Sequence, residues 1–147
     1  MSNYKIYAVN YADAAYEYAR CVNSETARTI GKVDEILEFH PEDIADFQAE
    51  HSEIFAYKRG AGLWLWKPYV IYKALQQIED GAWLFYCDSG AMYYNNVRIL
   101  VDCAIKDGEE CMVFQLTWAS AHQYTKAETF EWMGWNDRKH YQVIGGY

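Results

Sequence analysis

A single carboxylate, that of Asp88, stands where a predicted strand ends. Residues 82–87 (Ala-Trp-Leu-Phe-Tyr-Cys) are apolar or aromatic, which is typical of a buried strand, and Asp88-Ser89-Gly90 follows directly. Ligands of open α/β sheets bind beyond the carboxyl ends of the strands. Removing a carboxylate from water beside a buried strand costs free energy unless a cation or hydrogen-bond donors contact it. We therefore predict that Asp88 is a site residue; the alternative is a structural Asp that caps a turn with Gly90 at positive φ.

A glycine-rich segment precedes that strand and leads into a predicted helix. The segment is residues 59–68, Arg-Gly-Ala-Gly-Leu-Trp-Leu-Trp-Lys-Pro. Gly60 and Gly62 permit positive φ angles or a close approach of the backbone to a ligand. The segment lacks the Gly-Lys-Ser/Thr ending of a P-loop, so a triphosphate-binding loop of that kind is not predicted.

Four side chains of this segment could contact an anionic or flat ligand. The cations of Arg59 and Lys67 could bind phosphates, and the rings of Trp64 and Trp66 could stack on a sugar or a base. Each residue also has a purely structural interpretation. The two tryptophans would then belong to the core, Lys67 would solvate the start of the helix, and Arg59 would bind carbonyl groups of its own loop.

Strands and helices alternate along the chain. The strand candidates are 5–10, 33–39, 82–87 and 111–116; the helix candidates are 14–30, 41–47, 68–78, 97–107 and a last one that begins at a capping box at 125–128. This alternation predicts a single α/β domain over residues 1–147, with three α/β/α layers and a mainly parallel sheet. Because the carboxyl ends of parallel strands share one edge, Asn10, Asp88 and the residues after Leu116 should lie together.

Three finer expectations concern burial. Strand 82–87 is apolar on both faces, so we expect it in the centre of the sheet. The buried face of helix 68–78 is predicted to consist of Val70, Ile71, Ala74, Leu75 and Ile78. The buried face of helix 14–30 is predicted to consist of Ala15, Tyr18, Val22 and Ile30.

The composition is that of a folded domain with an aromatic-lined surface. Of the 147 residues, 52% are hydrophobic, and the chain holds 14 Tyr and 6 Trp, more than a core of this size normally uses. Flat amphipathic rings suit sugars, nucleobases or peptides. The net charge of -8 and the lack of Lys/Arg clusters argue against a nucleic-acid partner. A phosphate ligand would need a metal cation or local Lys and Arg side chains.

The cysteines and the N-terminus favour a cytoplasmic protein. Cys21, Cys87, Cys103 and Cys111 show no C-x-x-C spacing, and reduced thiols are their expected state. The first residues lack a basic and then apolar signal, and no apolar run approaches the ~20 residues that a membrane span needs. We therefore expect a cytoplasmic protein without a transmembrane segment.

Residue spacing argues against two other kinds of chemistry. Ser89 follows a strand, but Cys87 stands two positions before it, so the Gly-x-Ser-x-Gly motif of a serine nucleophile is absent. The four histidines match no zinc pattern such as H-E-x-x-H. Neither a serine nucleophile nor a dedicated zinc site is therefore predicted.

Several blocks of the sequence together resemble one family. They are Arg-Gly-x-Gly-hydrophobic-Trp-hydrophobic-Trp-Lys-Pro at 59–68, an Asp-Gly turn at 80–81, and an aromatic strand that ends in Asp-Ser-Gly at 88–90. In this order they are similar to a group of bacterial GT-A-type glycosyltransferases, which are often linked to surface-polysaccharide synthesis. Residues 33–36 and 124–130 belong to the same resemblance, which covers the chain from about residue 27 onward.

The resemblance implies a GT-A-like fold that binds a nucleoside-diphosphate sugar and transfers the sugar to a glycan or glycolipid acceptor. It also implies that Asp88 holds Mn²⁺ or Mg²⁺, which would neutralise the departing diphosphate. The residues that it places at the donor are Asn10, Tyr11, Arg59, Trp66, Lys67, Asp88, Ser89 and Gly90. The candidates for the acceptor side are His122, Thr125 and Lys126, although Thr125 has an alternative role as a helix cap.

Two departures from the family's pattern support an alternative function. These enzymes commonly carry Asp-x-Asp, whereas Gly90 stands at the second acidic position here. Their catalytic domains usually run beyond this length, and residues 142–147 resemble the approach to a further element, so we expect a domain that is incomplete at its C-terminus. The alternative is a non-catalytic nucleotide-sugar-binding domain, or one that a homo-oligomer or a second subunit completes.

Overall fold

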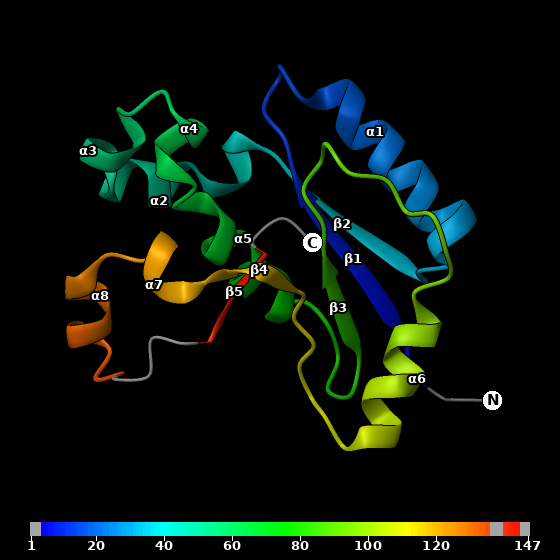
Figure 1. Ribbon diagram of the computed structural model, residues 1–147. Helices are drawn as coiled ribbons and strands as arrows, with labels where there is room; N and C mark the ends of the chain where they lie inside the picture. The colour runs from blue at the N-terminus through cyan, green and yellow to red at the C-terminus, as the bar shows by residue number, and fades with distance from the viewer. Residues whose placement is uncertain (1–3, 136–139, 145–147) are drawn as a thin grey trace.

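A computed structural model of the chain describes residues 4–135 and 140–144, and its centre is a parallel sheet of three strands (Figure 1). The strands are β1 (Ile6–Tyr11), β2 (Glu35–Phe39) and β3 (Trp83–Tyr86), in the spatial order β2-β1-β3. Tyr7 of β1 lies opposite Glu35 of β2 and Leu84 of β3. All six residues of β1 are buried, because this strand has neighbours on both edges and helices on both faces.

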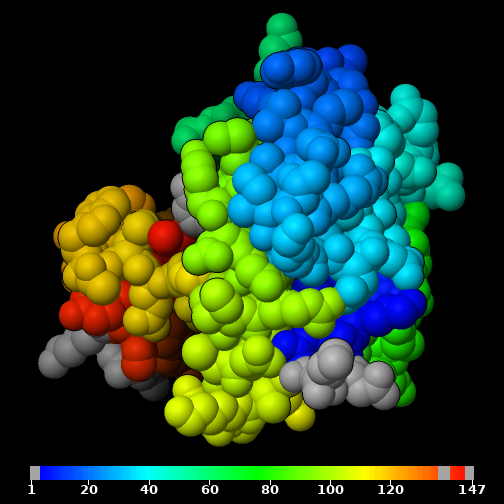
Figure 2. All heavy atoms as spheres, turned by 90° about the vertical axis from the view of Figure 1, so that its right-hand side faces the viewer, coloured from blue at the N-terminus to red at the C-terminus, as the bar shows by residue number. Residues whose placement is uncertain are grey.

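One face of the sheet carries helices that come from two distant parts of the chain. They are α1 (Glu17–Thr26) with the π-helical turn η1 (Ala27–Gly31), and α6 (Arg98–Asp107). Ile6 and Ala8 of β1 point to this face and form a core cluster with Ala27 and Val101. In Figure 2, α1 and the segment that leads into α6 lie side by side over this face.

The other face carries the connection between β2 and β3. Its elements are η2 (Pro41–Ile44), α2 (Ala45–Glu50), α3 (Ser52–Phe55), α4 (Gly60–Leu63) and α5 (Trp66–Leu75). Val9 and Tyr11 point to this face and form a second core cluster with Val70 and Ala74, because successive side chains of a strand alternate between its faces. The predicted α/β class and the parallel sheet are therefore confirmed. Within the described ranges, no helix combines the length and the apolar character that crossing a membrane requires.

The last part of the chain contradicts the fourth predicted strand. Residues 111–114 are not a strand; β4 is Gln115–Ser120 and pairs antiparallel with β5 (Tyr141–Val143). In the sequence, the helices α7 (Ala121–Tyr124) and α8 (Ala127–Trp132) come between these two strands. Because β4 takes its partner from β5, it is separate from the parallel sheet. The prediction that the residues after Leu116 follow a strand of the parallel sheet is therefore wrong.

Strand β3 lies at an edge of the sheet and not in its centre. Its four residues are half-buried, and no strand of residues 4–135 or 140–144 pairs with its outer side. The prediction of a central strand is wrong because, in the described ranges, β3 pairs only with β1, and the one later strand before β5, β4, pairs with β5. β1 takes the central place, and only β1 among the three strands is buried throughout.

The buried face of α1 is polar, and the apolar face predicted for this helix is wrong. The exposed members of the predicted set are Ala15, Tyr18 and Ile30, with Tyr18 exposed by 83%. Arg20, Asn23 and Ser24 are buried instead. The side-chain amide of Asn10 on β1 donates hydrogen bonds to Asn23 and Ser24, and these bonds fix which side of the helix faces the sheet.

Helix α5 buries fewer apolar residues than predicted. It ends at Leu75, so Ile78 lies outside it, and Leu75 itself is exposed. The buried residues of α5 are Trp66, Val70 and Ala74.

The predicted capping box at residues 125–128 is wrong. Helix α8 begins after Lys126, and its N-terminus has no side-chain cap. Thr125 has an extended backbone one position before that N-cap residue, too early to cap the helix. A capping interaction forms at α7 instead, where the Gln123 Oε1 accepts a hydrogen bond of 3.0 Å from the Ser120 N–H.

Gly62 tests the packing of the segment that leads into α5. Its φ is +94°, and a Cβ at this position would lie 2.6 Å from a ring carbon of Phe55. Gly81 is the matched control, because its φ is +82° but a Cβ there would meet nothing within 4 Å. We expect Gly62→Ala to lower the free energy of unfolding by about 2–4 kcal/mol and Gly81→Ala by about 1 kcal/mol, since only the first adds a steric clash. Urea unfolding followed by circular dichroism measures both, and equal losses would contradict this packing.

Candidate functional site

The carboxyl ends of β1 and β3 frame the candidate site. The connection that leaves β1 runs through α1 to β2, away from β3. The connection from β2 to β3 crosses β1 on the other face of the sheet, opposite to α1. The connection from β1 therefore leaves open the space between the ends of β1 and β3. Ligands of open α/β sheets bind in such a space.

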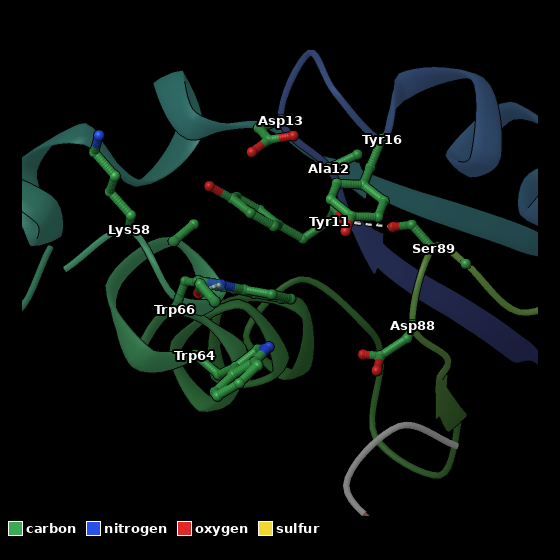
Figure 3. Close-up of a pocket in the computed structure, with 12 residues that line it drawn as sticks. Tyr11, Ala12, Asp13, Tyr16, Lys58, Trp64, Trp66, Asp88 and Ser89 are labelled. Atoms are coloured by element: carbon green, nitrogen blue, oxygen red, sulfur yellow. Dashed lines mark hydrogen bonds between the residues drawn. The ribbon is translucent and has the colours of Figure 1, made fainter.

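A pocket of about 410 Å³ occupies this position. The β1 end contributes Tyr11, Ala12, Asp13 and Tyr16, the β3 end contributes Asp88, Ser89 and Gly90, and the segment before α5 contributes Lys58, Gly60, Ala61, Trp64 and Trp66. Figure 3 shows the rings of Tyr11 and Trp66 one above the other, with Asp13 on one side and the Asp88 carboxylate directed toward the same space from the β3 end. The pocket thus combines aromatic surface with two carboxylates and one lysine.

The wall made by the segment before α5 is a left-handed turn. Five consecutive residues, 60–64, have positive φ angles, and the Trp64 N–H donates to the Gly60 carbonyl at 3.0 Å. Gly60 is required because a Cβ there would lie 2.5 Å from the Trp64 ring. The conformation costs roughly 1–2 kcal/mol at each non-glycine residue, so packing must hold it. The sequence-based expectation of positive φ at Gly60 and Gly62 is confirmed.

The aromatic side chains of the pocket divide into a buried pair and an accessible pair. Tyr11 and Trp66 are buried and stacked, with ring centroids 4.3 Å apart, and the Trp66 Nε1–H donates to the Gly60 carbonyl at 3.0 Å. Trp64 is 44% exposed and Tyr16 is 59% exposed. The accessible rings, those of Trp64 and Tyr16, are therefore the ones that a flat ligand can stack on.

The phenol of Tyr11 stays protonated at neutral pH. Burial raises its pKa to about 12, and the carboxylates of Asp13 and Glu42 act in the same direction. Tyr11 is therefore an uncharged hydrogen-bonding group in the wall and not an anion.

Asp88 is engaged by two groups of the protein. The Lys67 ammonium lies 2.9 Å from its Oδ1, and the Tyr86 hydroxyl donates a hydrogen bond to the same oxygen. Burial raises the pKa of Tyr86, and the hydrogen bond to Asp88 and the charge of that carboxylate raise it further. Tyr86 therefore remains a hydrogen-bond donor to Asp88 over the whole range of pH in which proteins work.

The Asp88 carboxylate is already paired with a cation, the Lys67 ammonium, which competes with a metal ion for it. Mg²⁺ takes about six oxygen ligands, of which the protein commonly supplies one or two carboxylates while waters and substrate phosphates supply the rest. Here one carboxylate is present at the β3 end, and one of its oxygens already accepts from Lys67 and Tyr86. The described ranges contain no group of three or more His, Cys, Asp or Glu side chains that could hold an ion. Binding of Mn²⁺ or Mg²⁺ by Asp88 stays a prediction.

Buried polar side chains join α1 to the loop after β3. The Asn23 side-chain amide donates to the carbonyl groups of Ala91, at 3.0 Å, and Asp88, at 3.4 Å. Its Oδ1 accepts from the Asn10 amide at 2.9 Å. Ser89 connects the two strand ends directly, because its hydroxyl donates to the Tyr11 carbonyl. These bonds hold the backbone of residues 88–91 in place beside β1.

The structure brings most of the predicted donor residues together. Tyr11, Trp66, Asp88, Ser89 and Gly90 line the pocket. Lys67 contacts Asp88 from behind the wall. Asn10 is fully buried beneath α1 and Arg59 lies over the Trp64 ring at 5.5 Å, so neither is a wall residue.

The predicted acceptor residues lie elsewhere. His122 is in α7, where its Nδ1 is 3.0 Å from the Ser120 hydroxyl, and Thr125 and Lys126 follow that helix. Thr125 lines a different pocket, together with residues of α8. His122, Thr125 and Lys126 are therefore not in the wall of the pocket at the strand ends.

Sequence reasoning missed three charged or aromatic wall residues, Asp13, Tyr16 and Lys58. Asp13 and Tyr16 belong to the turn after β1, so their position directly beyond a predicted strand end was a usable signal. Lys58 precedes the glycine-rich turn, and its sequence context carried no comparable signal. Trp64 was weighed as a core residue, but its ring is an exposed part of the wall.

The chain matches no family model, no curated protein and no solved structure with which it was compared. The geometry of the pocket and the sequence blocks that line it are therefore the features that bear on its function.

Asn23→Ala tests the polar bonds that hold the β3 loop. The substitution removes the buried partner of the Ala91 carbonyl and of one N–H of the Asn10 amide, whose other N–H still bonds to Ser24. Each group that loses its partner costs about 1–3 kcal/mol. We expect the free energy of unfolding to fall by about 2–4 kcal/mol. Glu25→Ala, on the exposed side of the same helix, is the control and should change it by less than about 0.5 kcal/mol. Similar values for the two variants in urea unfolding would refute this role of Asn23.

Proposed function

We propose that the pocket binds a nucleoside-diphosphate sugar and that the protein transfers the sugar to a glycan or glycolipid acceptor, as a GT-A-like glycosyltransferase. One observation carries the proposal: the two sequence blocks that resemble this family, 59–68 and 88–90, line the same pocket at the ends of adjacent parallel strands. The blocks are far apart in sequence, and their meeting at the position where α/β sheets bind ligands supports a shared role.

The size of the pocket and its aromatic and hydrogen-bonding side chains suit the base and sugar of such a donor. A volume of about 410 Å³ lies within the ~300–1,000 Å³ typical of small-ligand sites. The exposed rings of Trp64 and Tyr16 offer stacking surfaces for a base or a sugar. The carboxylates of Asp13 and Asp88 can accept hydrogen bonds from ribose or sugar hydroxyls, and Lys58 offers a cation to the phosphates.

Transfer requires little covalent chemistry from the protein. The bond between the sugar's anomeric carbon and the diphosphate oxygen breaks, and a new bond forms between that carbon and an acceptor hydroxyl oxygen. The diphosphate leaves with the bonding electron pair, and the acceptor hydroxyl loses its proton to a base. The protein contributes by holding donor and acceptor together and by placing positive charge near the leaving diphosphate.

A second candidate function is binding of the same donor without transfer. It is favoured by the position of His122, Thr125 and Lys126, the candidates for the acceptor side, which are not wall residues of the pocket. A domain of this kind would present or sense the nucleotide sugar, and a homo-oligomer or another subunit would supply the acceptor side.

Nucleotide binding and the role of Trp64 can be tested together. Thermal and urea unfolding of the protein should show stabilisation by UDP, GDP or one of their sugars, by about 2.7 kcal/mol when the ligand is present at 100 times its Kd. Trp64→Ala should weaken the binding about 10-fold, because stacking on an aromatic ring contributes about 1–3 kcal/mol. Trp132→Ala removes an exposed ring of α8 outside the pocket and should leave the affinity unchanged.

The outcomes separate the two candidate functions. Release of nucleoside diphosphate from a donor, measured with and without oligosaccharide acceptors, supports the transferase. Binding with no release of diphosphate supports the non-catalytic alternative. No stabilisation by any of these nucleotides at millimolar concentration would refute both.

A further inference from the structure

Lys67 lies behind the pocket wall and is held there by Asp88. It belongs to the first turn of α5, and its Nζ is 2.9 Å from the Asp88 Oδ1. The same Nζ is 5.2 Å from the centroid of the Tyr86 ring and 5.8 Å from that of Trp66. The Lys67 side chain is only 18% exposed. Its ammonium is therefore an enclosed positive charge in contact with two wall residues, Trp66 and Asp88.

The charged groups of the wall alone do not suit an anionic ligand. They are the carboxylates of Asp13 and Asp88 and the ammonium of Lys58. Two carboxylates against one ammonium would repel a diphosphate, and the net charge of -8 of the whole chain adds to this repulsion. A diphosphate at the β3 end therefore needs a further cation beside Asp88. Lys67 is such a cation, already in place.

We propose that Lys67 is the cation that binds the diphosphate of the ligand, in the role that the GT-A resemblance gives to a divalent metal ion, and that Asp88 positions Lys67. The inference rests on the proposed nucleotide-sugar function. An ammonium on a phosphate forms charge-assisted hydrogen bonds, which are among the stronger polar contacts in proteins. The N-terminus of α5 adds to the positive potential, because Lys67 lies in its first turn.

The ion pair can share its ammonium with a ligand. The Asp88 side chain is 43% exposed, so water can solvate its carboxylate when phosphate oxygens approach Lys67. Loosening this ion pair leaves neither charge without a partner, because phosphate oxygens replace the carboxylate at Lys67 and water solvates Asp88. The Tyr86 hydroxyl continues to hold the Asp88 carboxylate during the exchange.

Calorimetric titration of the whole chain with inorganic pyrophosphate tests the inference without knowledge of the sugar or the base. The titration is made with EDTA and with excess Mg²⁺, for the wild type and for Lys67→Met, Lys67→Arg and Asp88→Asn. Lys73→Met is the matched control, because Lys73 is in the same helix but its Nζ donates to the Asp43 carbonyl. Circular dichroism checks the folding of each variant.

We expect pyrophosphate to bind in EDTA with an affinity that Mg²⁺ does not raise. Lys67→Met should weaken binding about 10- to 100-fold, as the loss of a charge-assisted hydrogen bond does, whereas Lys67→Arg and Lys73→Met should retain it. Asp88→Asn should bind at least as tightly as the wild type, because the Asn side-chain oxygen can still accept a hydrogen bond from Lys67 and so keep it in position, while a like charge beside the phosphates is removed. Binding that needs Mg²⁺ and is lost in Asp88→Asn would overturn the inference, and so would no binding of pyrophosphate under either condition.

Parallel titrations with UDP-glucose and GDP-mannose separate this inference from the proposed function. Binding of a nucleotide sugar only with Mg²⁺ would refute the role of Lys67 and leave the proposed function standing. Binding of pyrophosphate through Lys67, without binding of any nucleotide sugar, would support the role of Lys67 as an anion-binding residue and refute the proposed function.

Discussion

The complete burial of β1 is the constraint on which the rest of the structure depends. Because this strand is covered on both faces, its amide side chain, that of Asn10, must find partners inside the protein. It finds them on α1, in Asn23 and Ser24, and Asn23 in turn holds the carbonyl groups of the loop after β3. Hydrogen bonds that begin at the middle strand of the sheet therefore hold the loop after β3, which forms part of the pocket wall.

The sequence predicted those parts of the fold that depend on residues close together in the chain. The apolar run of β3 followed by Asp88, and the two glycines with positive φ, could be recognised because each depends on a few neighbouring residues. The partner of β4 could not be recognised, because a strand's own sequence does not say which edge it will join. The polar face of α1 was missed for a similar reason: its bonds to β1 override the apolar spacing along the helix.

The same distinction holds within the site. Asp88 was predicted from its position at a strand end, and it lines the pocket. Tyr11, which the family resemblance places at the donor, lines the pocket as well. Asn10 precedes Tyr11 by one residue, and the two-residue period of a strand turns its side chain to the opposite face. The contact between Lys67 and Asp88 joins the start of a helix to the end of a later strand. No spacing rule connects two such positions, so only the folded chain reveals that the two charges meet.

The edge position of β3 has a consequence for the behaviour of the protein in solution. The Trp83 N–H donates to the Lys5 carbonyl just before β1, and the Cys87 N–H donates to the Val9 carbonyl in β1, so by alternation the N–H groups of Leu84 and Tyr86 point outward. Along this side runs a groove of about 540 Å³, lined by apolar residues of α5, β3 and α6. Amide hydrogens directed into that groove will exchange with solvent faster than those of β1. At high concentration, unprotected strand edges of this kind promote pairing between molecules. Charge and shape along the β3 edge therefore influence the solubility of the protein.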